Sequence, residues 1–166
     1  WRGRAYYELK DYPTALADLN KAIELQPEDG NNYRWRGVAY QALKDHTFAL
    51  ADFNKAIELQ PEGAVNYARR GCLHLTLNDL QNAEADFAQV ESLLEDNDGW
   101  PAYYIAGGYV LQSQTTEACL WLRRAFERDK SLVNEARTDS DFDPIRETEE
   151  FRKLMEEFGS NEKSAD

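Results

Sequence analysis

The chain has 166 residues, enough for one domain or a short array of repeats, and its 42% hydrophobic content excludes a globally disordered protein. Its formal net charge of -12 makes nucleic acid and anionic membrane surfaces poor partners, because both present repelling phosphate groups. Two cysteines are too few for a disulfide framework, and no apolar run approaches the roughly 20 residues of a membrane span, so we expect a cytoplasmic protein with reduced thiols.

The first elements along the chain belong to an internal repeat. Residues 1–29 read WRGRAYYELKDYPTALADLNKAIELQPED and residues 35–63 read WRGVAYQALKDHTFALADFNKAIELQPEG, so 21 of 29 positions match at an offset of 34. Such a match indicates duplication and predicts a repeat architecture. A weaker third copy follows at the same offset, and a fourth fits if the loop 95–99 holds one extra residue.

Each copy has the pattern of two helices joined by a short polar turn. In the second copy, small and bulky apolar residues recur at helical spacing on both sides of the turn 44–46. Pro61 ends the second helix, because proline cannot continue the hydrogen-bond ladder. The sequence therefore predicts helices at residues 1–9, 13–26, 30–43, 46–59, 64–77, 80–94, 100–112 and 115–129.

These residues resemble the pattern of the tetratricopeptide repeat (TPR) family. The family pattern places bulky, small and aromatic residues at fixed points of a 34-residue unit. In the second copy these points are occupied by Tyr33, Gly37, Tyr40, Ala49, Phe53, Ala56 and Pro61. The third copy departs from it at His74, Val90 and Glu95, and the fourth at Ala106 and Lys130. The resemblance covers residues 1–130 and implies an all-α fold. That fold is a right-handed α-solenoid of units 1–29, 30–63, 64–98 and 99–130, in a bacterial-type array.

The beginning of the chain falls inside a repeat. Trp1 aligns with Trp35, so the first unit lacks the residues that correspond to 30–34. We therefore expect the chain to be a fragment of a longer protein. The alternative is a trimmed chain with nothing important upstream.

After residue 130 the pattern changes to that of a cap. Ser131–Thr138 reads as a short helix, and Asp143 reads as an N-cap with Pro144 at the first helical position. Residues 148–158 form an amphipathic pattern. We expect residues 131–158 to cover the apolar face of the last repeat, with Phe151, Leu154 and Phe158 buried, and residues 159–166 to be a flexible tail.

Residue patterns of catalysis and metal binding are missing from the sequence. It has no glycine-rich phosphate loop, no cluster of histidine and cysteine, and no nucleophile elbow. The acidic run 139–143 superficially resembles a calcium loop, but it lacks the central glycine and the correctly spaced glutamate. We interpret this run as helix capping and solvated charge, and expect a protein that is not an enzyme and has no cofactor or metal.

The TPR resemblance also implies a binding groove lined by the first helix of each unit. Transferring that register to this chain gives Trp1, Arg4, Tyr7, Arg34, Trp35, Val38, Gln41, Arg69, Cys72, Tyr103 and Tyr104. Arginine among aromatic residues is typical of binding surfaces, and guanidinium groups pair with carboxylates. We therefore predict a groove for a protein or peptide, one that is acidic or carboxylate-rich. The alternative is that these aromatic residues pack on neighbouring repeats.

Two functions remain open at this point. The first is a scaffold or adaptor that binds a protein partner in the groove. The second is a regulatory or sensor segment of a larger signalling protein, whose ATPase or protease part lies outside this chain. The clamp by which the family binds chaperone tails is matched here only at Arg69, and it is contradicted at Trp35 and Val65, which argues against a cochaperone.

Overall fold

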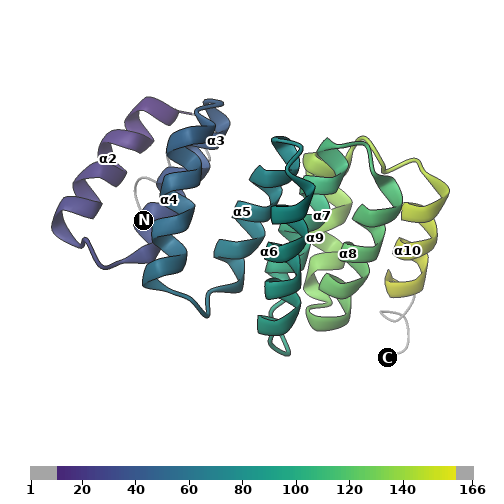
Figure 1. Ribbon diagram of the computed structural model, residues 1–166. Helices are drawn as coiled ribbons and strands as arrows, with labels where there is room; N and C mark the ends of the chain where they lie inside the picture. The colour runs from purple at the N-terminus through teal and green to yellow at the C-terminus, as the bar shows by residue number, and fades with distance from the viewer. Residues whose placement is uncertain (1–10, 160–166) are drawn as a thin grey trace.

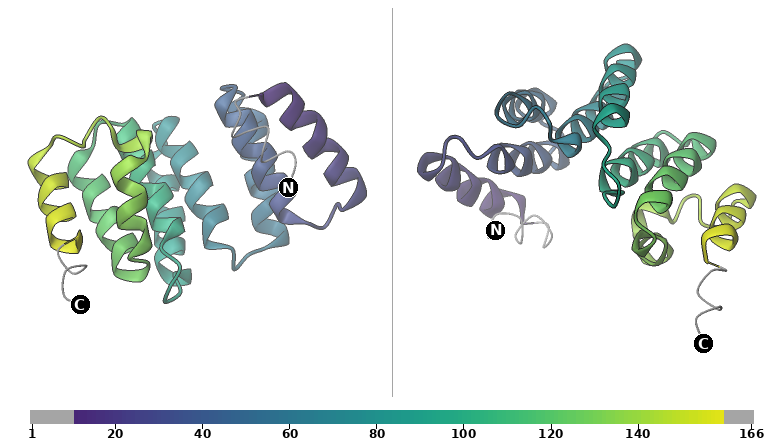
Figure 2. Two further views of the ribbon diagram at one scale, coloured as in Figure 1. Left: turned by 180° about the vertical axis from the view of Figure 1, so that it is seen from behind. Right: turned by 90° about the horizontal axis from the view of Figure 1, so that it is seen from below.

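The computed structural model describes residues 11–159, and between these residues it contains helices and no strands. The α-helices are α2 (Tyr12–Leu25), α3 (Gly30–Ala42), α4 (His46–Leu59), α5 (Ala64–Thr76), α6 (Leu80–Leu93), α7 (Trp100–Leu111), α8 (Thr115–Arg128), α9 (Ser131–Thr138) and α10 (Glu149–Gly159). A 3-10 turn, η1 (Ser140–Phe142), follows α9. The helices pack as antiparallel pairs that stack into a right-handed α-solenoid (Figures 1 and 2).

The predicted helices are confirmed over the described range. Each one predicted between residues 13 and 129 is present, with both ends within one residue of the predicted position. The short helix at 131–138 is also present, and the amphipathic helix expected at 148–158 is α10. The helix predicted at 1–9 lies outside the described residues.

The turn between the two helices of a unit has the same geometry in the second, third and fourth units. Lys44, Asn78 and Ser113 occupy the same place in successive turns and have φ values of 62°, 59° and 58°. In each turn the next residue donates its backbone N–H five residues back, to the carbonyl oxygen of Tyr40, His74 or Tyr109, at 2.9–3.0 Å. This is the Schellman arrangement, which satisfies carbonyl groups at a helix end and fixes where the chain turns back.

A polar network also recurs every 34 residues. Arg36 of α3 donates to both carboxylate oxygens of Asp52 of α4 at 2.7 Å, and to the Asn20 amide oxygen of α2 at 2.8 Å. The network therefore joins three helices from two successive units. Bidentate pairing of this kind is stronger than a bond between neutral groups.

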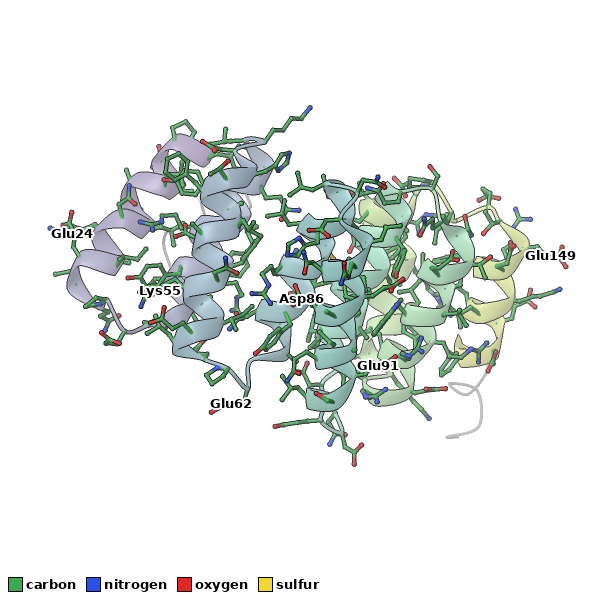
Figure 3. The ribbon with its side chains drawn as sticks, in the orientation of Figure 1. Glu24, Lys55, Glu62, Asp86, Glu91 and Glu149 are labelled. Carbon is green, nitrogen blue, oxygen red and sulfur yellow. The ribbon has the colours of Figure 1, made fainter. Side chains whose placement is uncertain are left out.

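The second copy of the network has the same geometry. Arg70 binds the two carboxylate oxygens of Asp86 at 2.9 and 2.6 Å, and Asn54 at 2.7 Å. Asp86, labelled in Figure 3, is only 4% exposed. In the fourth unit the equivalent positions hold Ile105 and Trp121, both buried in the apolar core. The array therefore changes from a polar to an apolar joint at its last unit.

The main core lies in the third and fourth units and the cap. Phe142, Phe151 and Leu154 are buried in it, which confirms the predicted burial of the last two. Phe158 is only half-buried, with its ring centre 5.6 Å from that of Phe126 in α8. The cap thus extends the hydrophobic core beyond the last repeat, as expected for the end of a solenoid.

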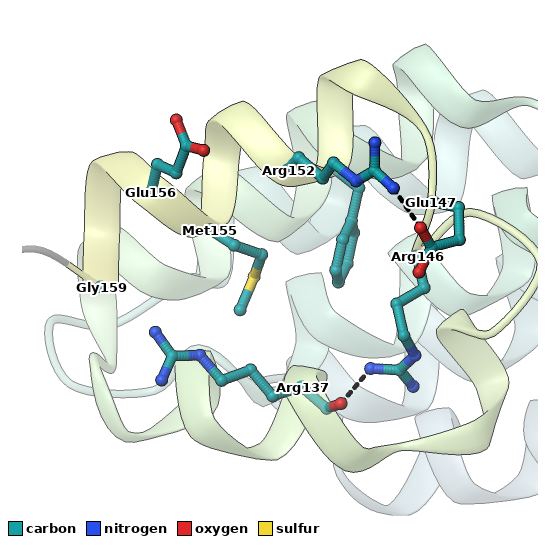
Figure 4. Close-up of a pocket in the computed structure, with 8 residues that line it drawn as sticks. Arg137, Arg146, Glu147, Arg152, Met155, Glu156 and Gly159 are labelled. Carbon is teal, nitrogen blue, oxygen red and sulfur yellow. Dashed lines mark hydrogen bonds and ion pairs between the residues drawn. The ribbon is translucent and has the colours of Figure 1, made fainter.

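The predicted helix start at Asp143 and Pro144 is wrong. The Asp143 carboxylate accepts hydrogen bonds from the Arg146 guanidinium at 2.7 and 3.1 Å. That guanidinium also donates to carbonyl oxygens at the end of α9, including those of Ala136 and Arg137, as Figure 4 shows for Arg137. Asp143 therefore positions the Arg146 side chain, which caps the C-terminal end of α9. α10 begins later, after Thr148, whose hydroxyl accepts from the Phe151 N–H at 3.3 Å.

Candidate functional site

A cavity of about 240 Å³ opens on the face formed by the first helices of the units. Its walls come from α3, α5, α7 and η1, so three units and the cap all contribute. The lining residues are Gln41, Arg69, Cys72, Trp100, Tyr103, Tyr104, Gly107, Gly108, Leu111, Asp139, Asp141 and Phe142. We refer to this space as the α5–α7 cavity.

The predicted groove residues divide into those that reach this cavity and those that do not. Five of them line it, namely Gln41, Arg69, Cys72, Tyr103 and Tyr104. Arg34 and Trp35 are half-buried on α3 and do not line it, since Arg34 donates to Asn31 at 2.9 Å and Trp35 packs on the core around Phe53. Trp1, Arg4 and Tyr7 lie outside the described residues.

Val38 does not reach a groove surface, contrary to its place in the predicted set. It is 4% exposed and packs with Phe53 and Leu73. The residue faces the joint between α3 and α5, where two successive first helices meet. A side chain in this position stabilises the stacking of units and is inaccessible to a partner.

The guanidinium of Arg69 lies over the ring of Tyr104, with its carbon 3.7 Å from the ring centre. Within the described part of the chain, Arg69 makes no hydrogen bond or ion pair. Stacking on an aromatic ring fixes the plane of the guanidinium and leaves the N–H groups at its edge free to donate. The guanidinium of Arg69 is therefore preorganised to bind a planar anion such as a carboxylate through two parallel hydrogen bonds.

Cys72 forms part of the cavity floor and has no nucleophilic character. It is 8% exposed, and its thiol donates to the Tyr104 carbonyl oxygen at 3.4 Å. Burial raises the pKa of this thiol to about 12, against the smaller opposing effect of the Arg69 charge. The sulfur therefore stays protonated at neutral pH, and protonated thiols are poor nucleophiles.

Two adjacent glycines of α7 shape the cavity in different ways. At Gly108 an added Cβ would meet the Cys72 sulfur at 2.6 Å, so this glycine allows α7 to approach α5. At Gly107 an added Cβ would meet nothing within 4 Å. Gly107 therefore exposes bare backbone to the cavity, although glycine inside a helix is destabilising by about 0.5–1 kcal/mol relative to alanine.

The cap supplies a wall of the cavity that was not predicted from the sequence. Tyr103 is buried and donates from its hydroxyl to the Asp139 carboxylate at 2.9 Å, while the ring of Phe142 lies 5.0 Å from the Tyr103 ring. Burial raises the pKa of the Tyr103 phenol well above its ordinary value, and the bond to Asp139 raises it further. Asp139 and Asp141 thus lie in the cavity wall and are more than solvated charge. Phe142 within the acidic run was the available sequence signal, since an aromatic residue there indicates packing.

A larger cavity of about 670 Å³ lies at the cap between α9 and α10 (Figure 4). Arg137, Arg146 and Arg152 line it together with Phe151 and Met155. Arg146 is held by backbone carbonyl oxygens, and Arg152 pairs with Glu147. Because two of its three guanidinium groups are engaged internally, this cavity is less suited to bind an anion than the α5–α7 cavity.

The described range offers neither a metal cluster nor a membrane span. Between residues 11 and 159, no group of three or more His, Cys, Asp or Glu side chains is arranged to hold a metal ion. None of the helices from α2 to α10 combines the length and apolarity that crossing a bilayer requires.

Both sequence models of protein families and solved structures match this chain as an array of tetratricopeptide repeats. The family model described as TPR repeat matches residues 3–44, and the model described as tetratricopeptide repeat matches residues 33–62 and 64–97. No curated protein matches the chain in sequence.

Solved structures share the fold. The first TPR of Spaghetti (RPAP3), bound to the HSP90 peptide SRMEEVD, is 25% identical, with a TM-score of 0.57 over 68% of this chain and 90% of that chain. A thermophilic TPR protein from Thermus thermophilus is 21% identical, with a TM-score of 0.67 over 81% of this chain and 74% of that one. MamA from Desulfovibrio magneticus RS-1 is 17% identical, with a TM-score of 0.55 over 99% and 93%. From the matching family models, the repeated helix pairs and these neighbours together, we conclude that the chain belongs to the tetratricopeptide repeat family.

Proposed function

We propose that this protein is a protein–protein interaction module, a scaffold or adaptor of the cytoplasm, which binds a peptide segment of its partner in the α5–α7 cavity. Recognition depends on a carboxylate of that segment, and no chemical reaction takes place. The observation that carries the proposal is Arg69, stacked on Tyr104 without an acceptor in the described part of the chain.

The environment of Arg69 favours binding over a purely structural role. Two arginines that join units of this array are bonded to carboxylates, Arg36 to Asp52 and Arg70 to Asp86. Arg69 is next to Arg70 in sequence but is turned toward the cavity, where a partner's carboxylate would complete its hydrogen bonds. Hydrogen bonds that involve a charged group contribute about 1.5–3 kcal/mol each.

The structural neighbours support the kind of ligand. The TPR of RPAP3 is bound to an HSP90 peptide that ends in Glu-Glu-Val-Asp, so a similar array binds a segment with several carboxylates. The present chain has Trp35 and Val65 at points where the chaperone-tail clamp uses polar residues. The likeness therefore supports recognition of a carboxylate and does not extend to that particular partner.

A displayed library of random peptides, selected on the wild-type protein, tests the proposal. We expect enrichment of segments containing Asp or Glu, with affinity reduced about tenfold or more by Arg69→Glu, because at least one charge-assisted contact is lost. Gly107→Leu should also weaken binding, since its side chain enters the open space at that position without meeting a neighbour at Cβ.

Lys130→Glu is the matched control, because it makes the same change of charge at an exposed residue outside the cavity. It should leave the affinity unchanged, and circular dichroism should show intact helices in all three variants. The proposal fails if no peptide is enriched, or if Arg69→Glu binds the enriched peptides as tightly as the wild type does.

A further inference from the structure

We infer that the segment bound in the α5–α7 cavity is a helix that carries a large apolar side chain three or four residues from its carboxylate. This side chain would fill the space that Gly107 leaves open on α7, which we call the Gly107 gap, while the carboxylate pairs with Arg69. The inference rests on the proposed function and specifies the chemistry and conformation of the partner.

One face of α7 has large apolar side chains on both sides of the Gly107 gap. Its members follow one another at steps of four, three and four residues, which places them in one row along the helix, namely Trp100, Tyr104, Gly107 and Leu111. All four line the α5–α7 cavity. Trp100 is 37% exposed and Leu111 is 75% exposed, so both side chains are accessible. An accessible apolar row with one side chain missing can receive a side chain from a partner.

The position of Gly107 contacts the next first helix in the two preceding units. It lies six residues before the positive-φ turn residue of its unit, and the same position holds Val38 in α3 and Cys72 in α5. Val38 packs with Leu73 of α5, and the Cys72 thiol donates to a backbone carbonyl oxygen of α7 at 3.4 Å. At Gly107 an added Cβ would meet nothing within 4 Å. A position that receives a helix elsewhere in the array is therefore open on α7.

The cap leaves the Gly107 gap unfilled. α9 packs against α8 and α10, and η1 meets α7 where the ring of Phe142 lies 5.0 Å from that of Tyr103. Neither element places an atom within 4 Å of a Cβ at Gly107. A helix of a partner can therefore contact α7 here by the kind of packing that joins successive first helices.

The place of Arg69 relative to the gap determines the spacing in the ligand. The guanidinium carbon of Arg69 lies 3.7 Å from the ring centre of Tyr104. Tyr104 precedes Gly107 by three residues, which is about 4.5 Å along a helix axis. On a helix, side chains three or four residues apart are neighbours on one face, about 5–6 Å from each other. A helical ligand with this spacing can therefore reach Arg69 and the gap at the same time.

The charge of the protein favours an apolar second contact over a second carboxylate. Arg69 is the only lysine or arginine among the described residues that line the cavity, and one guanidinium pairs with one carboxylate when both parallel hydrogen bonds form. At a net charge of -12 the protein also repels a polyacidic segment at long range. An apolar side chain adds affinity without this repulsion, because contact with the row on α7 removes its surface from water.

The test uses alanine-based, helix-favouring peptides with one glutamate, in which a leucine is placed one, two, three or four residues to either side. Fluorescence anisotropy measures their affinity for the full chain, and circular dichroism checks that the peptides are equally helical. We expect the best peptide with a spacing of three or four to bind about tenfold more tightly than the peptide without leucine, as for the burial of one large apolar side chain. Leucine one or two residues from the glutamate should add little.

Gly107→Leu fills the gap from the protein's own side, so the peptides with and without leucine should bind this variant alike. Ala88→Leu is the matched control, because it adds a leucine at an exposed residue of α6 outside the cavity. It should preserve the preference for leucine. If Gly107→Leu loses helicity, Leu111→Ala replaces it and should reduce the preference, because it removes one accessible member of the apolar row.

Two kinds of failure are distinguishable. A leucine preference that is absent in the wild type, independent of spacing, or unchanged in the α7 variant overturns the inference while carboxylate recognition stands. Failure of every glutamate peptide to bind the wild type overturns the proposed function as well.

Discussion

Gly108 of α7 and Cys72 of α5 are in direct contact, because a Cβ placed at residue 108 would lie 2.6 Å from the Cys72 sulfur. A Cβ placed at the neighbouring Gly107 would have no such neighbour within 4 Å. Two consecutive glycines in one helix thus have different reasons to be there. Gly108 permits the close packing of two units, and Gly107 leaves space in the α5–α7 cavity.

The two glycines should respond in opposite directions to alanine. Gly107→Ala should raise the free energy of unfolding by about 0.5–1 kcal/mol, because alanine favours the helix and meets no neighbour. Gly108→Ala should lower it by about 1–3 kcal/mol through overpacking. Urea unfolding measures both. Cys72→Ala should reduce the cost of Gly108→Ala in the double variant. An equal cost in both backgrounds would show that the Cys72 contact does not limit packing.

The turn residues offer a second matched pair. Lys44→Asn should stabilise the protein and Asn78→Lys should destabilise it, each by up to about 1 kcal/mol, because both positions have positive φ and asparagine tolerates that conformation better than lysine. Thermal unfolding with equal protein concentrations measures the effect. Changes of the same sign in the two variants would contradict this account and would point to side-chain contacts instead.

The polar network predicts a strong coupling between its members. Asp86→Ala should lower the free energy of unfolding by about 3 kcal/mol, because it leaves the Arg70 guanidinium without its carboxylate. A double variant, Arg70→Met with Asp86→Leu, should lose much less, as the apolar equivalents Ile105 and Trp121 already occur in the fourth unit. A double-mutant cycle measures the coupling. Additive losses would show that the pair acts independently.

The cap should matter for both stability and binding. Leu154→Ala should cost about 2–5 kcal/mol as a large-to-small core change, since Leu154 is 2% exposed. Deletion of residues 148–166 removes Phe151, whose ring lies 6.4 Å from that of Phe142 in the cavity wall. The shortened chain should therefore melt at lower temperature and bind peptides more weakly. Unchanged melting would mean that the fourth unit needs no cover.

The repeat made the helices predictable, because the same small and aromatic positions recur and each turn is closed by the same backbone bonds. The site was harder to predict from sequence. Tyr103 and Asp139 are 36 residues apart, and nothing in the repeat pattern places η1 against α7. The repeat register predicts Val38 in the groove, because it distinguishes only one buried stripe on each first helix. Residues between successive first helices are buried as well, and Val38 is one of them. Arg69 lines the α5–α7 cavity, and its role in binding a partner stays a prediction.

The change from polar joints between the first three units to an apolar joint at the last unit limits where another repeat could be inserted. The bonds of Arg36 to Asn20 and of Arg70 to Asn54 are the same joint, formed one unit further along. A gene duplication that inserted another copy of residues 30–63 in this region would meet compatible side chains on both sides. The equivalent positions of the fourth unit hold Ile105 and Trp121, which lie in the apolar core and lack the arginine–aspartate pair of the polar joints. An array of this kind can therefore be lengthened within its first units without a change at its capped end.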